Sequence, residues 1–166
     1  MTYTHPAPET VAPTEDPKTL ALLRNDLRGL TKDDIGALVA ELTRRMGVDP
    51  ALAPIDLIPD RGGALRLYIN ARGAAELAKR HELNDEDLDV DIRDRVVIVK
   101  VAKTDPSGRM LRDVGAASFD VDRPDTLARA VKMATTSAHR RATLRMVGIF
   151  LNEPESWSSA ETLPDA

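Results

Sequence analysis

The chain has 166 residues, 42% of them apolar and 30% charged, and no cysteine. This composition predicts one soluble globular domain and excludes disulfides, thiolate metal sites and a cysteine nucleophile. The net charge is −4, no apolar run is long enough to span a bilayer, and the acidic, proline-rich N-terminus is unlike a signal peptide. We therefore expect a cytoplasmic protein without membrane contact.

The N-terminal part of the chain predicts a tail followed by two helices. Residues 1–17 hold four prolines without periodicity and are expected to be disordered. Apolar residues recur at helical spacing from Lys18 to Leu30. Thr31, with Asp34 three residues further on, resembles a capping box that begins a second helix, and Gly47 ends it. We expect the two helices to serve packing or subunit contact.

The next segment predicts a linker and then a strand–helix unit. Residues 48–63 contain three prolines and two consecutive glycines, which is typical of a loop. Leu65–Ile69 has the composition of a strand, and Asn70 is placed to cap a helix from Ala71 to about His81. We expect this unit to support the core sheet.

Strict alternation of polar and apolar residues predicts a strand with one wet face. The wet face carries Asp87, Asp89 and Asp91, and the other face carries Leu88, Val90 and Ile92. Clustered carboxylates are also a candidate site for a divalent metal, but the spacing lacks the glycine and terminal glutamate of an EF-hand loop. We favour the solvated strand over the metal site.

A hairpin follows this strand. Val96–Lys103 predicts a strand, Asp105–Gly108 has proline and glycine where a type I turn prefers them, and Met110–Phe119 returns as the partner strand. The hairpin carries four basic residues, Lys100, Lys103, Arg109 and Arg112. These are either plain surface charges or a basic strip beside the helix that comes next.

The longest helical pattern runs from about Thr126 to Val147, with Asp122 or Asp125 as its cap and Gly148 after its end. One face is apolar and is expected to face the core: Leu127, Val131, Ala134, Ala138 and Ala142. The opposite face is polar and is expected to face water or an anion: Arg129, Lys132, Thr136, His139, Arg140 and Thr143.

Arg141 and Arg145 interrupt this division, because both project from the apolar side of the helix. A guanidinium placed there needs a carboxylate, a carbonyl or a phosphate as its partner. Two interpretations stay open. One is an internal salt bridge or a solvent-edge arginine. The other is a contact surface for a nucleic-acid backbone, since the small alanines Ala134 and Ala138 leave room for that backbone to approach the helix closely.

Charge is divided unevenly along the chain. From Arg95 to Leu151 there are eleven Lys/Arg against five Asp, about +6, whereas the remainder carries twelve Lys/Arg against twenty-two Asp/Glu, about −10. Such segregation of charge is typical of nucleic-acid-binding proteins, and the net charge alone does not reveal it. Residues 152–166 form an acidic tail, expected to be flexible and able to compete with DNA for the basic face.

The elements together predict an α+β fold. Its core is a three-stranded antiparallel β-sheet packed on a long basic helix, preceded by N-terminal helices and the strand–helix unit. We expect one domain over residues 18–151, with helices at 18–46, the linker at 48–63 and the core at 65–151.

Two stretches of this core resemble a known family. Ser107–Gly115, SGRMLRDVG, precedes the basic helix, which reads KMATTSAHRRATLRMVGIFLNE from Lys132 to Glu153. This pattern resembles the phage-type single-strand DNA annealing proteins, the group of lambda Red beta, RecT and Erf, whose core is similar to that of the eukaryotic annealing protein Rad fifty-two. The resemblance covers about Leu83–Glu153 and is most specific at the Arg140–Arg141 pair.

The resemblance implies single-stranded DNA in a basic groove of an oligomeric ring or filament. It also implies annealing of complementary strands in recombination without nucleotide hydrolysis, and a phage exonuclease or a host single-strand binding protein as candidate partners. The chain has no Walker-type GxxxxGK[ST] motif, which agrees with annealing without ATP, and we expect no cofactor and no catalytic residue. Annealing needs phosphates whose charge is neutralised and bases that stay accessible. Lys and Arg side chains neutralise phosphates, and a chain with few aromatic rings does not cover the bases by stacking.

Ten residues are candidate DNA contacts. The resemblance implies Arg140 and Arg141 as the principal phosphate contacts. Their place on the helix adds Lys132 and Arg145, and the outer face adds Arg129 and His139. The hairpin supplies a second strip, formed by Lys100, Lys103, Arg109 and Arg112.

Two other classes of protein remain as alternatives. A metal-dependent nuclease would use Asp87, Asp89 and Asp91, and it requires these carboxylates to lie beside the basic helix. A scaffold protein would use its charges only for assembly and would bind no single strands at low salt.

Overall fold

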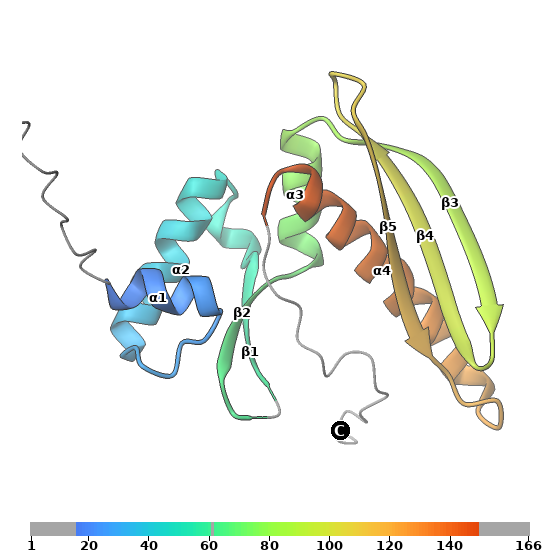
Figure 1. Cartoon of the computed structure of the whole chain (residues 1–166), viewed down its shortest axis with the longest axis horizontal. Coiled ribbons are helices and arrows are strands. Elements are labelled where there is room, and N and C mark those ends of the chain that lie inside the picture. Colours follow the sequence, from blue (N-terminus) through green and yellow to red (C-terminus); the bar gives the residue numbers. More distant parts are fainter. Residues whose placement is uncertain (1–15, 61, 150–166) are drawn as a thin grey trace, which may run out of the picture.

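The computed structural model describes residues 16–60 and 62–149, and the predicted tails at 1–17 and 152–166 lie almost wholly outside these ranges. The chain has an α+β fold (Figure 1). Helices α1 (Pro17–Arg24) and α2 (Lys32–Met46) and a two-stranded sheet form the N-terminal half. A three-stranded antiparallel sheet and the long helix α4 (Pro124–Met146) form the C-terminal half, and α3 (Ala71–Arg80) packs against α4 between them.

Helix α2 (Lys32–Met46) forms as predicted: the Thr31 hydroxyl accepts the Asp34 N–H, and Gly47 ends the helix at a φ of 65°. Helix α1 (Pro17–Arg24) is shorter than predicted, so the expectation of a helix through Leu30 is wrong. The reason is tertiary. Asn25 adopts a left-handed conformation, and its side-chain amide accepts the Leu67 N–H at 2.9 Å and donates to the Leu67 carbonyl at 3.3 Å. These bonds fix the chain against the sheet instead of extending the helix.

The predicted linker at 48–63 contains a strand that the sequence did not indicate. A short 3₁₀ helix, η1 (Pro50–Leu52), leads into β1 (Ile55–Pro59), which pairs antiparallel with β2 (Leu65–Ile69). Of the three prolines that suggested a loop, Pro50 begins η1, Pro54 directly precedes β1 and Pro59 ends it. A sheet of two strands has only edges, where proline is tolerated. Strand β2 and helix α3 (Ala71–Arg80), capped by Asn70, form as predicted.

The predicted three-stranded antiparallel sheet is confirmed, in the order β3-β4-β5, with β3 at Asn84–Arg93, β4 at Val96–Thr104 and β5 at Met110–Ser118. Helix α4 packs on β4 and β5, where Val97, Val99 and Val101 are at most 1% exposed. Their partners on β3 share this inner face by register but stay 43–53% exposed: Leu88, Val90 and Ile92. The expected apolar face of β3 is therefore left largely uncovered.

Helix α4 (Pro124–Met146) is the predicted long helix, but its N-cap is Arg123, without a side-chain cap bond, and not Asp122 or Asp125. Pro124 occupies the first helical position, where its missing N–H is harmless. After the helix, Gly148 adopts a φ of 79°, and Ile149 N–H donates to the Leu144 carbonyl at 2.8 Å. None of the described helices is long and apolar enough to cross a membrane.

The contact between α4 and the sheet depends on small residues. Ala134, Ala138 and Ala142 are fully buried as predicted, whereas Leu127 and Val131 of the predicted stripe are only partly buried. Facing the helix, Gly115 on β5 has so little room that an added Cβ would lie 2.0 Å from the Ala134 carbonyl oxygen. The alanine stripe thus lets backbone approach backbone, which bulky side chains would prevent.

Candidate nucleic-acid interface

The ten predicted DNA contacts do not form one strip. The structure places them in four locations: the interior beneath α4, the β3 side of the sheet, the β5 edge, and the exposed face of α4. Burial and ion pairs decide which of these residues a phosphate could reach.

Arg140 lies inside the molecule and is only 4% exposed. Its guanidinium carbon sits 4.3 Å from the centre of the Tyr68 ring on β2, a cation–π arrangement. Thr143 is buried as well, at 2% exposed, so the prediction that both residues face outward is wrong. The physical reason is that α4 has two covered sides. One packs on the sheet, and the other packs toward α3 and β2, which sequence periodicity alone does not reveal.

Replacing Arg140 with alanine should therefore destabilise the fold, by about 2 kcal/mol or more, because the substitution removes buried packing over Tyr68 as well as the cation–π contact. Chemical denaturation followed by circular dichroism measures this. Arg129→Ala on the exposed face of the same helix is the control, with an expected change within about 0.5 kcal/mol. A loss of stability no larger for Arg140 than for Arg129 would contradict the buried placement.

On the β3 side of the sheet, basic residues are matched by acidic ones. Lys103 is 4% exposed, and its ammonium lies 2.5 Å from the Asp85 carboxylate, with His139 Nδ1 3.3 Å from the same oxygen. Lys100 pairs with Asp89 at 3.1 Å. This part of the predicted second strip is thus engaged by the aspartates of β3 and offers little positive charge to a ligand.

The β5 edge holds four further predicted contacts: Arg109, Arg112, Arg141 and Arg145. Both helix arginines form ion pairs with the Asp113 carboxylate, with guanidinium nitrogens at 3.0 Å for Arg145 and 3.5 Å for Arg141. The interpretation of this arginine pair as part of an internal salt bridge is therefore confirmed. Their side chains nevertheless remain 51% and 41% exposed, while the Asp113 carboxylate is 4% exposed.

Two further arginines extend the β5 edge. Arg109 donates to Asp105 at 3.1 Å and to the Met146 carbonyl at 2.5 Å, and its side chain is 61% exposed. Hydrogen bonds from the Ser107 hydroxyl and from the backbone hold the pKa of Asp105 below its usual value. Arg112 is exposed, but alternation along β5 puts its side chain on the opposite face of the sheet from Asp113. Arg109, Arg141 and Arg145 together with Asp105 and Asp113 give this edge a net charge of +1.

Arg129 and Lys132 are exposed on α4, away from the β5 edge. The three aspartates of the nuclease alternative lie on the face of the sheet opposite α4, because they alternate with the residues that pair with the buried valines: Asp87, Asp89 and Asp91. The requirement that they lie beside the basic helix is therefore not met. Within the described residues, no group of three or more His, Cys, Asp or Glu side chains could hold a metal ion.

Sequence reasoning overlooked Asp113, the residue that organises the β5 edge. A signal was present: alternation along Met110–Ser118 puts Asp113 on the same face as Leu111, Gly115 and Ala117, where a carboxylate needs a cationic partner. Comparison with models of known protein families finds no match for this chain. Comparison with curated proteins finds no similar sequence either.

Proposed function

We propose that the chain binds single-stranded DNA and anneals complementary strands without nucleotide hydrolysis, using the β5 edge as its phosphate-binding surface. The observation that carries this proposal is that Arg141 and Arg145 lie one helical turn apart and stay 41% and 51% exposed, while Arg109 bonds the end of the same helix through the Met146 carbonyl. The order of three strands and a helix, with the resemblance to phage-type annealing proteins, supports the same role.

The chemistry of the edge suits phosphate binding. Each guanidinium presents N–H donors in a planar fork that matches two phosphate oxygens, and the shared contact with Asp113 limits the rotamers that Arg141 and Arg145 adopt. Neutralising phosphates releases counterions and lets two like-charged strands approach each other. Aromatic side chains make up only 3% of the chain, so bases bound here stay available for pairing.

A homo-oligomer would strengthen this weak site. A few phosphate contacts per protomer give low affinity, and repetition of the edge multiplies it through effective concentration. We propose that a second copy contacts the apolar strip of β3, because Leu88, Val90 and Ile92 are 43–53% exposed on an edge strand. The same strip is what favours the alternative of a pure assembly protein, which would share the oligomer but lack the DNA affinity.

Val90→Lys is expected to lower the oligomer mass in light scattering and, through lost avidity, the affinity for long single strands. The reason is that a lysine on this strip puts a charge into an apolar contact. Val114→Lys is a matched control, since Val114 on β5 is also 43% exposed but its side chain lies on the opposite face of the sheet from Val90. An unchanged mass for Val90→Lys would reject β3 as the subunit contact.

The site is tested by fluorescence anisotropy with a labelled oligonucleotide across a salt series. Arg141→Ala/Arg145→Ala should bind markedly more weakly, and its salt slope should fall by about 1.4 if two phosphate contacts are lost. Arg129→Ala/Lys132→Ala removes the same charge from the same helix and is expected to bind close to wild type. A loss confined to the second variant would move the site to the exposed face of α4, and no binding by wild type at low salt would favour the assembly protein.

A further inference from the structure

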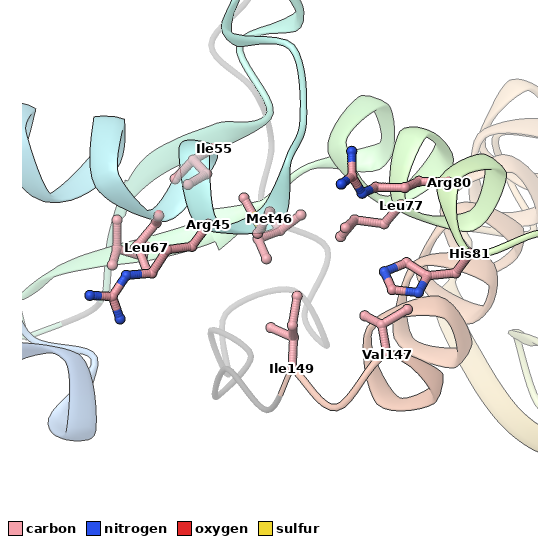
Figure 2. A pocket seen from close by; sticks show the side chains of 11 residues that line it. Arg45, Met46, Ile55, Leu67, Leu77, Arg80, His81, Val147 and Ile149 are labelled. Atoms are coloured by element: carbon pink, nitrogen blue, oxygen red, sulfur yellow. The ribbon is translucent and has the colours of Figure 1, made fainter.

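A cavity of about 510 Å³ lies where the N-terminal half meets the end of α4 (Figure 2). Its walls come from the end of α2, from β1 and β2, from the end of α3, and from Val147 and Ile149 just after α4. None of the ten candidate DNA contacts lines it. A cavity of this size falls in the range that holds ligands or buried side chains of a partner.

The cavity has an apolar floor and a cationic rim. Ile69 and Leu77 at its floor are 2% and 1% exposed. In Figure 2, Arg80 lies next to Leu77, and Arg45 lies beside Leu67 with its guanidinium directed away from Leu77; both arginines are exposed. Arg80 donates to the Gly47 carbonyl at 3.0 Å and has its guanidinium next to the apolar lining, whereas Arg45 pairs with Glu41 at 2.6 Å. An occupant should therefore combine apolar bulk with negative charge.

The chain beyond Ile149 has this composition. Residues 150–166 contain no Lys or Arg. Their large apolar residues are Phe150, Leu151, Trp157 and Leu163, and their acidic residues are Glu153, Glu155, Glu161 and Asp165. Ile149 itself forms part of the cavity wall, so the segment that follows begins at the cavity. Eight residues extend at most about 28 Å, enough for Trp157 to fold back to the floor.

We propose that the chain's own C-terminal segment, residues 150–157, docks in this cavity. The Trp157 ring lies against the partly buried lining residues Met46 and Val147, and the carboxylates of Glu153 and Glu155 face the arginines of the rim. Docking buries a large aromatic surface at a junction of helices and strands and so links the N-terminal half to α4. The acidic segment is then held away from the β5 edge, which differs from the expectation that it competes with DNA.

Trp157 is the only tryptophan in the chain, so its fluorescence reports on the proposal directly in the full-length protein. We expect a blue-shifted emission and a several-fold lower acrylamide quenching constant than in the denatured protein, both independent of protein concentration. Glu153→Lys/Glu155→Lys should shift the emission to the red and raise quenching. Asp122→Lys/Asp125→Lys makes the same charge change at the other end of α4 and should leave Trp157 unaffected.

A second variant changes the cavity itself. Val147→Asp places a carboxylate in the partly buried wall, where it opposes an acidic segment, and should also release Trp157 while circular dichroism stays unchanged. Native Trp157 as accessible to acrylamide as in the denatured protein would overturn the proposal. Emission that depends on protein concentration would overturn it too, because the occupant would then be a second copy. Unchanged Trp157 emission in both variants would also overturn the proposal.

Discussion

Gly115→Ala is expected to destabilise the protein by about 3 kcal/mol. The added Cβ would lie 2.0 Å from the Ala134 carbonyl oxygen and 2.7 Å from the Ala138 nitrogen, and both of these are backbone atoms of α4. They cannot move aside as a flexible side chain would, so either the helix shifts off the sheet or the strand bends. Both changes open the core formed by Val97, Val99 and the alanine stripe.

Gly36→Ala is the matched control for this prediction. Gly36 lies inside α2, where an added Cβ meets nothing within 4 Å, and alanine is a better helix former than glycine. We expect this variant to be more stable than wild type by about 0.5–1 kcal/mol. Urea denaturation of the three proteins measures both changes. A Gly115→Ala protein as stable as wild type would show that α4 does not approach β5 this closely.

Asp113→Asn is expected to raise the affinity for single-stranded DNA several-fold and to steepen the salt slope by about 0.7 to 1.4, the contribution of one to two phosphate contacts. Asp113 is the carboxylate that Arg141 and Arg145 share, and its removal takes a negative charge from the centre of the β5 edge. Asparagine keeps the oxygen that accepts the Val114 N–H, so the strand retains that bond. The cost is some stability, because a buried ion pair is broken.

Asp125→Asn is the charge-matched control, since Asp125 pairs with Arg123 in an exposed position at the start of α4. Anisotropy titrations at several salt concentrations, with denaturation curves for both variants, separate binding from folding. Tighter binding by Asp113→Asn alone would identify the β5 edge as the DNA surface. If the Asp113→Asn protein folds but binds single-stranded DNA no more tightly than wild type, the β5 edge is excluded as the DNA-binding surface.

Most of the elements could be predicted because local signals and tertiary packing agree in them. The capping residues Thr31 and Asn70 begin helices, and the β-branched run from Val96 with the turn at Asp105–Gly108 gives the hairpin. The failures occur where a distant contact decides the local structure. Asn25 ends α1 because its side chain bonds Leu67, forty-two residues away. Strand β1 forms because β2 pairs with it, despite the prolines that bound it.

The candidate site was harder to predict, because helical periodicity shows which residues share a face of the helix but not which other element packs against that face. Arg140 falls on a polar face by its spacing, yet the C-terminal part of that face, with Arg140 and Thr143, is covered, and Tyr68 lies across Arg140. Likewise, no pattern within the long helix indicates that His139 approaches Asp85, since that pairing depends on where β3 begins. Only the anomaly of Arg141 and Arg145 on the apolar face indicated that a buried partner was required, and Asp113 is that partner.

Annealing of two complementary oligonucleotides without ATP, followed by fluorescence energy transfer, measures the proposed activity most directly. The intact chain should speed duplex formation at about 50 mM salt and lose the effect as salt rises, because phosphate neutralisation is the source of the affinity. Arg141→Ala/Arg145→Ala should abolish the acceleration, and Arg129→Ala/Lys132→Ala should retain it. If the wild-type chain neither binds the single strands nor speeds their pairing at low salt, the annealing function is contradicted.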